Sequence, residues 1–182
     1  MAPPRIVIQT PAAESRFSRG FYQVEEDALY VPLYPARTFF SYLDSDLLSL
    51  QTDNQGQLVF LQLLLPRPNW IANPSIAWPD VSLTADVRLL DFRNQLPEIG
   101  VETSPDRSLV RIAFASETEA VAYRLTETLI CEVTPNARLT AIWIREIEDD
   151  RAAARMAAWR KGMKEGQNGP PETPFRRREI RG

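Results

Sequence analysis

One pattern occurs twice in the chain and constrains its fold more than any other feature. Residues 48–63, LSLQTDNQGQLVFLQL, align without a gap on residues 129–144, LICEVTPNARLTAIWI, at an offset of 81 positions. In both segments apolar residues alternate with others on each side of a polar turn, DNQG in the first and TPNA in the second. Alternation with a period of two is typical of half-buried strands, and Asp, Asn and Gly favour tight turns. Each segment is therefore predicted to form a β-hairpin.

A second pair of matching segments occurs in the same order. EDALYVPL at 26–33 aligns with TEAVAYRL at 118–125 at an offset of 92. Because the two offsets differ by about 11 residues, we expect an insertion of that length between Leu33 and Leu48 of the first copy. We interpret the two matches as an internal duplication. Hairpins of alternating pattern also align by chance, so coincidence is the alternative interpretation.

These motifs resemble a family of small bacterial proteins of unknown function. EDALYVPL followed by DNQGQLVFLQLL is similar to the family's ADALYI-type strand and DEDGRL-type hairpin, and TEAVAYRL with NARLTAIWI matches the same pattern more faintly. Members usually contain one such unit, so the resemblance implies that two are fused here. The family has no established enzymatic activity, and some members look like partners of small toxin-type proteins. The resemblance therefore implies a binding role.

The C-terminal part of the chain differs in pattern from the rest. Between 147 and 166, acidic residues come first and basic residues last, as the helix dipole favours. Ala152, Met156, Trp159 and Met163 are spaced to form one apolar stripe on a helix. Residues 167–182 have no periodic pattern and are predicted to be a flexible tail.

The sequence as a whole predicts a mostly β protein of the α+β type. Two related antiparallel hairpin or meander units share one core and are followed by an amphipathic helix and a tail. The predicted segments are an N-terminal extension at 1–20, a first β unit at 21–65, a Pro- and Trp-rich connector with one strand at 66–108, a second β unit at 109–148, a helix at 149–166 and a basic tail at 167–182.

The chain contains no histidine, which excludes Ser-His-Asp and Cys-His catalysis and histidine-ligated zinc. The acidic residues between 25 and 53 lack the spacing of a calcium loop and are predicted to be solvated turn residues. Cys131 aligns with Leu50 on an apolar strand face, so its thiol is predicted to be buried and inert. We therefore predict no catalytic, metal-binding or cofactor-binding residues, and a protein that is not an enzyme. An enzyme that uses carboxylates such as Glu25, Asp44 and Asp46 is an alternative.

The candidate partner-binding residues are aromatic or cationic. Aromatic side chains concentrated in a loop can anchor a partner, although they can equally extend the core. Tryptophans among prolines can form a platform for a peptide or pack across a sheet edge. An arginine cluster can contact nucleic acid or an acidic protein, or remain solvated. The candidates are Tyr34, Phe39, Phe40, Tyr42, Trp70, Trp78, Trp159, Arg176, Arg177 and Arg178.

We therefore predict a non-catalytic protein-binding or assembly module whose partner is another protein or a second copy of itself. A nucleic-acid-associated protein that acts through the basic tail is the alternative. The whole chain has a net charge of −3 and a pI of about 5.2, so we expect the residues outside the tail to repel phosphates. The N-terminus shows no signal-peptide pattern. The apolar run at 58–65 is far shorter than the ~20 residues of a membrane span. A cytoplasmic protein without membrane contact is expected.

Overall fold

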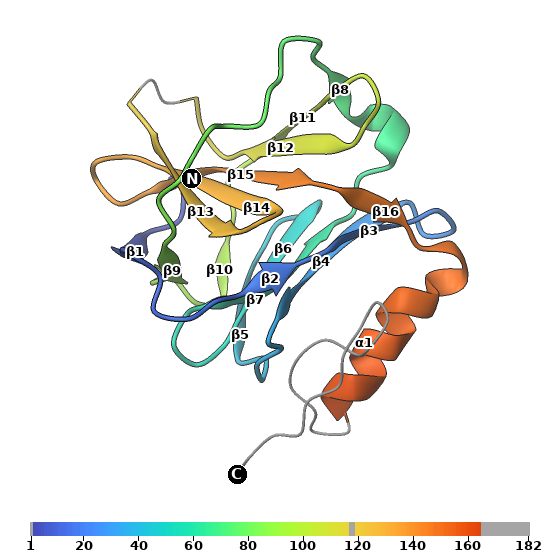
Figure 1. Cartoon of the computed structure of the whole chain (residues 1–182), viewed down its shortest axis with the longest axis horizontal. Coiled ribbons are helices and arrows are strands. Elements are labelled where there is room, and N and C mark those ends of the chain that lie inside the picture. The colour runs from blue at the N-terminus through green and yellow to red at the C-terminus, as the bar shows by residue number, and fades with distance from the viewer. Residues whose placement is uncertain (1, 117–118, 165–182) are drawn as a thin grey trace.

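The computed structural model describes residues 2–116 and 119–164, and this part of the chain is mostly β (Figure 1). It ends in the helix α1 (Ala154–Lys164). The predicted fold class is therefore confirmed. Two short 3₁₀ turns accompany the strands, η1 (Arg67–Asn69) and η2 (Arg151–Ala153).

The strands form two large sheets and a separate ribbon. The first sheet has the order β10-β5-β6-β7-β4-β3-β16, with β2 paired to β4, and the second has the order β13-β14-β15-β12-β11-β8. The strands of the first sheet are β2 (Phe17–Ser18), β3 (Gly20–Gln23), β4 (Ala28–Tyr34), β5 (Ser41–Asp44), β6 (Leu48–Thr52), β7 (Leu58–Leu63), β10 (Asn94–Gln95) and β16 (Ile147–Asp149). Those of the second are β8 (Ile71–Ala72), β11 (Gly100–Thr103), β12 (Leu109–Ala113), β13 (Val121–Thr126), β14 (Leu129–Val133) and β15 (Leu139–Arg145). The ribbon pairs β1 (Ile6–Gln9) with β9 (Asp86–Leu89).

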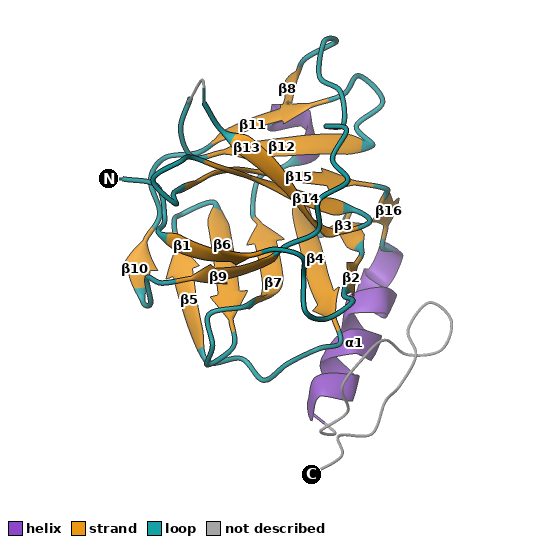
Figure 2. Ribbon diagram, turned by 60° about the vertical axis from the view of Figure 1, so that its left-hand side comes forward, coloured by secondary structure: helices purple, strands orange, loops and turns teal. Residues whose placement is uncertain are grey.

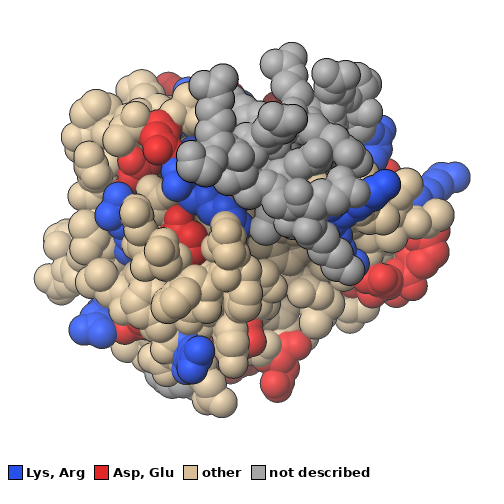
Figure 3. Space-filling model, turned by 90° about the horizontal axis from the view of Figure 1, so that it is seen from below, with Lys and Arg blue, Asp and Glu red and all other residues tan. Residues whose placement is uncertain are grey.

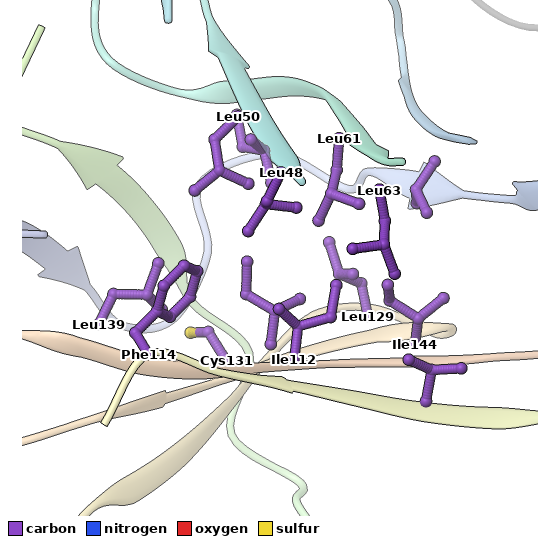
Figure 4. Packing of buried hydrophobic residues seen from close by; sticks show 14 of the residues in the cluster. Leu48, Leu50, Leu61, Leu63, Ile112, Phe114, Leu129, Cys131, Leu139 and Ile144 are labelled. Carbon is purple, nitrogen blue, oxygen red and sulfur yellow. The ribbon is translucent and has the colours of Figure 1, made fainter. Parts of the chain in front are cut away.

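The main core lies between the two large sheets. Alternation places every second side chain of a strand on one face, and the inward faces here are mostly leucine, isoleucine and valine. Figure 4 shows these side chains pointing toward one another from opposite sides. The first sheet contributes Leu48, Leu50, Leu61 and Leu63, and the second contributes Ile112, Leu129, Cys131 and Ile144, all at most 1% exposed.

The two predicted hairpins are present and have the same backbone register. In the first, Leu50 is paired with Leu61, and in the second Cys131 is paired with Ile142. Each hairpin has a register shift at the same place, after Gln51 in one and after Glu132 in the other. Their turns close with equivalent hydrogen bonds, from Asp53 N to Gln57 O and from Thr134 N to Arg138 O, both 3.0 Å long. All these positions differ by the offset of 81.

The predicted match at an offset of 92 is wrong. Strand β4 lies beside β7, where Val31 is paired with Leu61, and the same place beside β15 is occupied by β12, where Ile112 is paired with Ile142. Strand β13 instead lies beside β14, as β5 lies beside β6. The offset of 81 therefore continues through β4 and β12, and the segment between Leu33 and Leu48 contains no eleven-residue insertion. An alternating pattern specifies which face of a strand is buried but not which neighbour it pairs with.

Each large sheet is completed by chain from the other half of the molecule. Strand β8 follows β7 of the first sheet but lies parallel to β11 of the second, with Ile71 opposite Glu102. Strand β16 follows β15 of the second sheet but lies parallel to β3 of the first, with Glu148 opposite Phe21. The connector at 66–108 thus contains β8, β9, β10 and β11 rather than the one strand predicted.

The outer face of each large sheet is also covered by chain that comes from the other half of the molecule. After β8, Ile76, Trp78 and Val81 pack on the outer cluster of the second sheet, which contains Trp143. After β16, α1 lies outside the first sheet and places Met156 and Trp159 in the cluster of Tyr30 and Phe60 (Figure 2). Met156 and Trp159 of the predicted apolar stripe therefore face the sheet, whereas Ala152 is exposed and precedes α1.

The helix begins later than the predicted residue 149. Ala152 and Ala153 have positive φ angles of 55° and 53°, so regular helix starts only after them. The carboxylate of Asp150 accepts hydrogen bonds from Arg155 N at 2.9 Å and Met156 N at 3.0 Å, which satisfies donors that a helix start leaves open. The predicted tail at 167–182 lies outside the described residues.

The β1–β9 ribbon connects the two hairpin turns. Leu89 N donates to Gly56 O at 2.8 Å, and Ile6 N donates to Ala137 O at 3.0 Å. Gly56 has φ +81°, and a Cβ there would lie 2.3 Å from the carbonyl oxygen of Leu89. The equivalent residue, Ala137, adopts φ 55° with its Cβ accommodated. Glycine is therefore required at one turn and not at the other.

Replacing Gly56 with alanine is expected to lower the free energy of unfolding by about 2 kcal/mol or more, because the left-handed backbone and the clash with Leu89 act together. The matched change Ala137→Gly is expected to alter it by less than about 1 kcal/mol, since relief of the positive φ offsets the added freedom of the unfolded chain. Urea unfolding followed by circular dichroism measures both. Equal losses in the two variants would contradict the described contact.

Burial raises the pKa of the Cys131 thiol, which is the sole cysteine of the sequence. The native protein is expected to react negligibly with a thiol-specific disulfide reagent at pH 8, because reaction requires an accessible thiolate. In urea the same sample should react with one equivalent. Rapid reaction of the native protein would place Cys131 outside the core.

Candidate partner-binding surface

Two of the candidate aromatic residues belong to the cluster between the first sheet and α1. Tyr34 is fully buried on β4 and stacks on Phe17, with ring centroids 4.8 Å apart. Trp159 is 8% exposed and stacks on Phe60 at 5.2 Å. Neither side chain presents a surface to a partner. For Tyr34 this is the core alternative that the sequence left open, and for Trp159 it corrects the proposed binding role.

The two tryptophans of the connector also pack against the protein. Trp70 is 3% exposed, donates its indole N–H to Leu65 O at 3.0 Å and contacts the Tyr22 ring edge-on at 5.7 Å. Trp78 lies partly buried on the outer face of the second sheet, with the Arg145 guanidinium 4.6 Å from its ring centroid. This is the packing interpretation, in which the two rings hold the connector against the sheets. It corrects the idea of a peptide platform.

The remaining aromatic candidates are exposed and lie at the edge of the first sheet. Phe39 is 47% exposed, Phe40 57% and Tyr42 40%. Phe92, which is 43% exposed, joins them, because its ring lies edge-on to Phe40 with centroids 6.3 Å apart. We call Phe39, Phe40, Tyr42 and Phe92 the aromatic patch.

The backbone fixes the position of the aromatic patch. Phe40 N donates to Thr52 O at 2.8 Å, which extends the pairing of β5 with β6. Arg93 N donates to Tyr42 O at 2.8 Å and so holds the segment carrying Phe92 beside β5. Sequence reasoning missed Phe92, because β10 reaches β5 from the other half of the chain. The signal available was an aromatic residue between Asp91 and Arg93 in a segment without periodicity.

An acidic cavity of about 570 Å³ lies on the same strand. It is lined by residues 44–47 and 95–99, and it includes the carboxylates of Asp44, Asp46 and Glu98. Leu96 N donates to Asp44 O at 2.7 Å, which joins its two walls. Asp44 follows Tyr42 by two residues on β5, so the aromatic patch and the acidic cavity are neighbours. An arrangement of this kind can bind a cationic group beside an apolar one.

Glu25, which the enzyme alternative grouped with Asp44 and Asp46, does not line the acidic cavity. Glu25, in the turn between β3 and β4, accepts a hydrogen bond from Ala152 N at 3.1 Å. This N–H lowers the pKa of the Glu25 carboxyl. Within residues 2–116 and 119–164, no group of three or more His, Cys, Asp or Glu side chains is positioned to hold a metal ion.

Figure 3 shows one face on which acidic and basic side chains are interspersed among uncharged ones. Arg176, Arg177 and Arg178 lie outside the described residues. In the described part of the chain, no helix is both long and apolar enough to cross a membrane.

Comparison with protein-family models, with curated proteins and with solved structures gave no match. The resemblance to the small bacterial family therefore stays a prediction.

Truncation of an aromatic side chain distinguishes the surface residues from the core residues. Phe40→Ala is expected to change the free energy of unfolding by less than about 1 kcal/mol, because the ring is already more than half exposed. Trp159→Ala is expected to lower it by about 3 kcal/mol or more, because a buried ring is lost from the α1 contact. Urea unfolding monitored by circular dichroism gives both values. Similar values for the two variants would remove the distinction.

Proposed function

We propose that this protein is a non-catalytic protein-binding module that holds its partner at the aromatic patch. The partner segment that we infer combines an apolar or aromatic anchor with arginine or lysine. One observation carries it: strand β5 bears both Tyr42 of the aromatic patch and Asp44 of the acidic cavity.

The aromatic patch supplies the affinity. Phe40 and Phe92 leave about half of their surface in water, and covering one such ring contributes about 2 kcal/mol. Aromatic side chains at the centre of an interface are typical hot spots, since they bury large areas with few rotatable bonds. Backbone hydrogen bonds hold the segments that carry the patch, so the backbone loses little conformational freedom when a partner binds.

The acidic cavity supplies the charge preference. The carboxylates of Asp44, Asp46 and Glu98 attract a cationic segment and repel an acidic one. The C-terminal sequence of this chain has the required composition, because Phe175 is followed by Arg176, Arg177 and Arg178. It provides a natural probe, and its binding in another copy would produce self-association.

We also propose that the chain arose by duplication of one β unit. Support comes from the constant offset of 81 in paired positions: Tyr22 with Leu29 corresponds to Thr103 with Val110, and Leu48 with Leu63 corresponds to Leu129 with Ile144. The offset becomes 80 between β5 and β13. On this view Phe39, Phe40 and Tyr42 are features of the first unit alone, since the equivalent residues 119, 120 and 122 of the second are Glu, Ala and Ala.

A fluorescent peptide of residues 170–182, PPETPFRRREIRG, tests the binding surface in trans. We expect saturable binding to the full chain, at least about tenfold weaker for Phe40→Ser and for Asp46→Asn, and weaker at high salt. Val121→Ser is the control, because Val121 is 49% exposed on the other sheet. Fluorescence anisotropy measures the affinities, together with those of peptides in which Phe175 or the arginines are replaced by serine. Equal affinities for the patch variants and the control would refute the proposed surface.

A further inference from the structure

A second polar cavity, of about 240 Å³, lies where the N-terminal segment passes the end of β13. Its walls are Ala12, residues 14–16, Thr84 and residues 124–127. Two arginines, Arg16 and Arg124, line it from different segments. We call it the arginine cavity.

The arginine cavity and the acidic cavity occupy related places in the two halves of the molecule. The acidic cavity is lined by residues 44–47 and 95–99, and the arginine cavity by residues 124–127, Ala12 and residues 14–16. The residue numbers of the turn segments, 44–47 and 124–127, differ by 80. Those of the other two segments, 14–16 and 95–97, differ by 81. On the strands, Asp44 is paired with Ser49, and Arg124 is paired with Ile130, which is the equivalent of Ser49. An aspartate in one half is thus replaced by an arginine in the other.

Arg16 is a cation with incomplete pairing. Its Nη2 donates to the carbonyl oxygen of Leu58, its Nε is buried without an acceptor, and it forms no ion pair within the described residues. Burial, followed by the like charge of Arg37, lowers the pKa of the Arg16 guanidinium, and the carboxylates of Asp53, Asp86 and Glu14 offset part of this shift. A guanidinium removed from water is costly unless an anion accompanies it. The carbonyl of Leu58 carries no charge, and the carboxylates that attract Arg16 have other partners. Glu14 and Asp53 pair with Arg37, and Asp86 accepts a hydrogen bond from Ala13 N at 2.9 Å.

Arg124, from another segment of the lining, is paired in a similarly incomplete way. Its Nη2 donates to the carbonyl oxygen of Val81, and its Nε is also buried without an acceptor. The nearest carboxylate, that of Glu127, lies 3.9 Å from Nη1 on a side chain that is 77% exposed. Such a long, solvated contact contributes little.

Hydroxyl groups add further donors to the lining. Thr84 Oγ1 accepts a hydrogen bond from Ala12 N at 3.4 Å, so its own proton is available to another acceptor. Ser15 also lines the cavity. The two acidic side chains of the lining are directed to water or to other partners, since Glu14 pairs with Arg37 and Glu127 is exposed.

We propose that the arginine cavity binds a small oxyanion, of the size of phosphate, between Arg16 and Arg124. Guanidinium groups bind phosphate and carboxylate oxygens through paired N–H donors, and the hydroxyls can donate to the remaining oxygens. The site is separate from the aromatic patch, and its occupant is anionic where the partner proposed for that surface is cationic. Failure of either proposal therefore leaves the other intact.

The test is a titration of the isotopically labelled full chain with inorganic phosphate at constant ionic strength, followed by amide NMR spectra. We expect saturable shifts at residues 12–16, 84 and 124–127, and no shifts at the equivalent residues 44–47 and 95–99. Parallel titrations with O-phosphoserine and with acetate distinguish a free ion, a phosphate monoester and a carboxylate as the source of the oxyanion. Shifts that rise linearly without saturation, or that spread over both cavities, would overturn the proposal.

Variants at equivalent positions provide the matched control. Arg124→Gln is expected to weaken phosphate binding at least about tenfold, Arg124→Lys less, and Asp44→Asn not at all. Phosphate should likewise raise the melting temperature of the wild type and Asp44→Asn, but not that of Arg124→Gln. Unchanged phosphate affinity in Arg124→Gln would refute the site. Native spectra of the variants at residues 44–47 verify that the comparison is made on folded protein.

Discussion

The contact between the inner faces of the β6–β7 and β14–β15 hairpins is the interaction on which the rest of the structure depends. Leu48, Leu50, Leu61 and Leu63 on one side meet residues such as Leu129, Cys131 and Ile144 on the other, and all are withdrawn from water. A two-stranded hairpin with one apolar face is marginal alone in water. Each hairpin therefore requires the other, and the remaining strands extend the two sheets around this pair.

Strands β8 and β16 each pair with the sheet of the other half, so neither sheet is complete without the other half. Each sheet ends on a strand from the other half, and the chain that follows that strand covers the sheet's outer face. The two polar cavities follow from the same arrangement. Each lies between a turn of one half, at 44–47 or 124–127, and the segment at 95–99 or 12–16 that precedes the first sheet strand of the other half. Related positions thus carry opposite charges on one scaffold.

The sequence predicted the features that are set by neighbouring residues. Both hairpins were found because alternation and the turns at Asp53 and Thr134 act locally. Features that depend on distant contacts were missed. The pattern of 118–125 could not reveal that β13 pairs with β14. The apolar stripe around Trp159 indicated a helix face that packs on other residues, but not which sheet covers it. Of the candidate surface, Phe39, Phe40 and Tyr42 were identified, whereas Phe92 reaches them only through the β10–β5 pairing.

Native-state hydrogen exchange tests directly whether the two halves form one cooperative core. If they do, the most protected amides of β7 and of β15 open with the same free energy, and that value equals the free energy of global unfolding from urea denaturation. Exchange of one sheet at a clearly lower free energy, while the other stays protected, would mean that the halves are stable separately. That result would contradict the account.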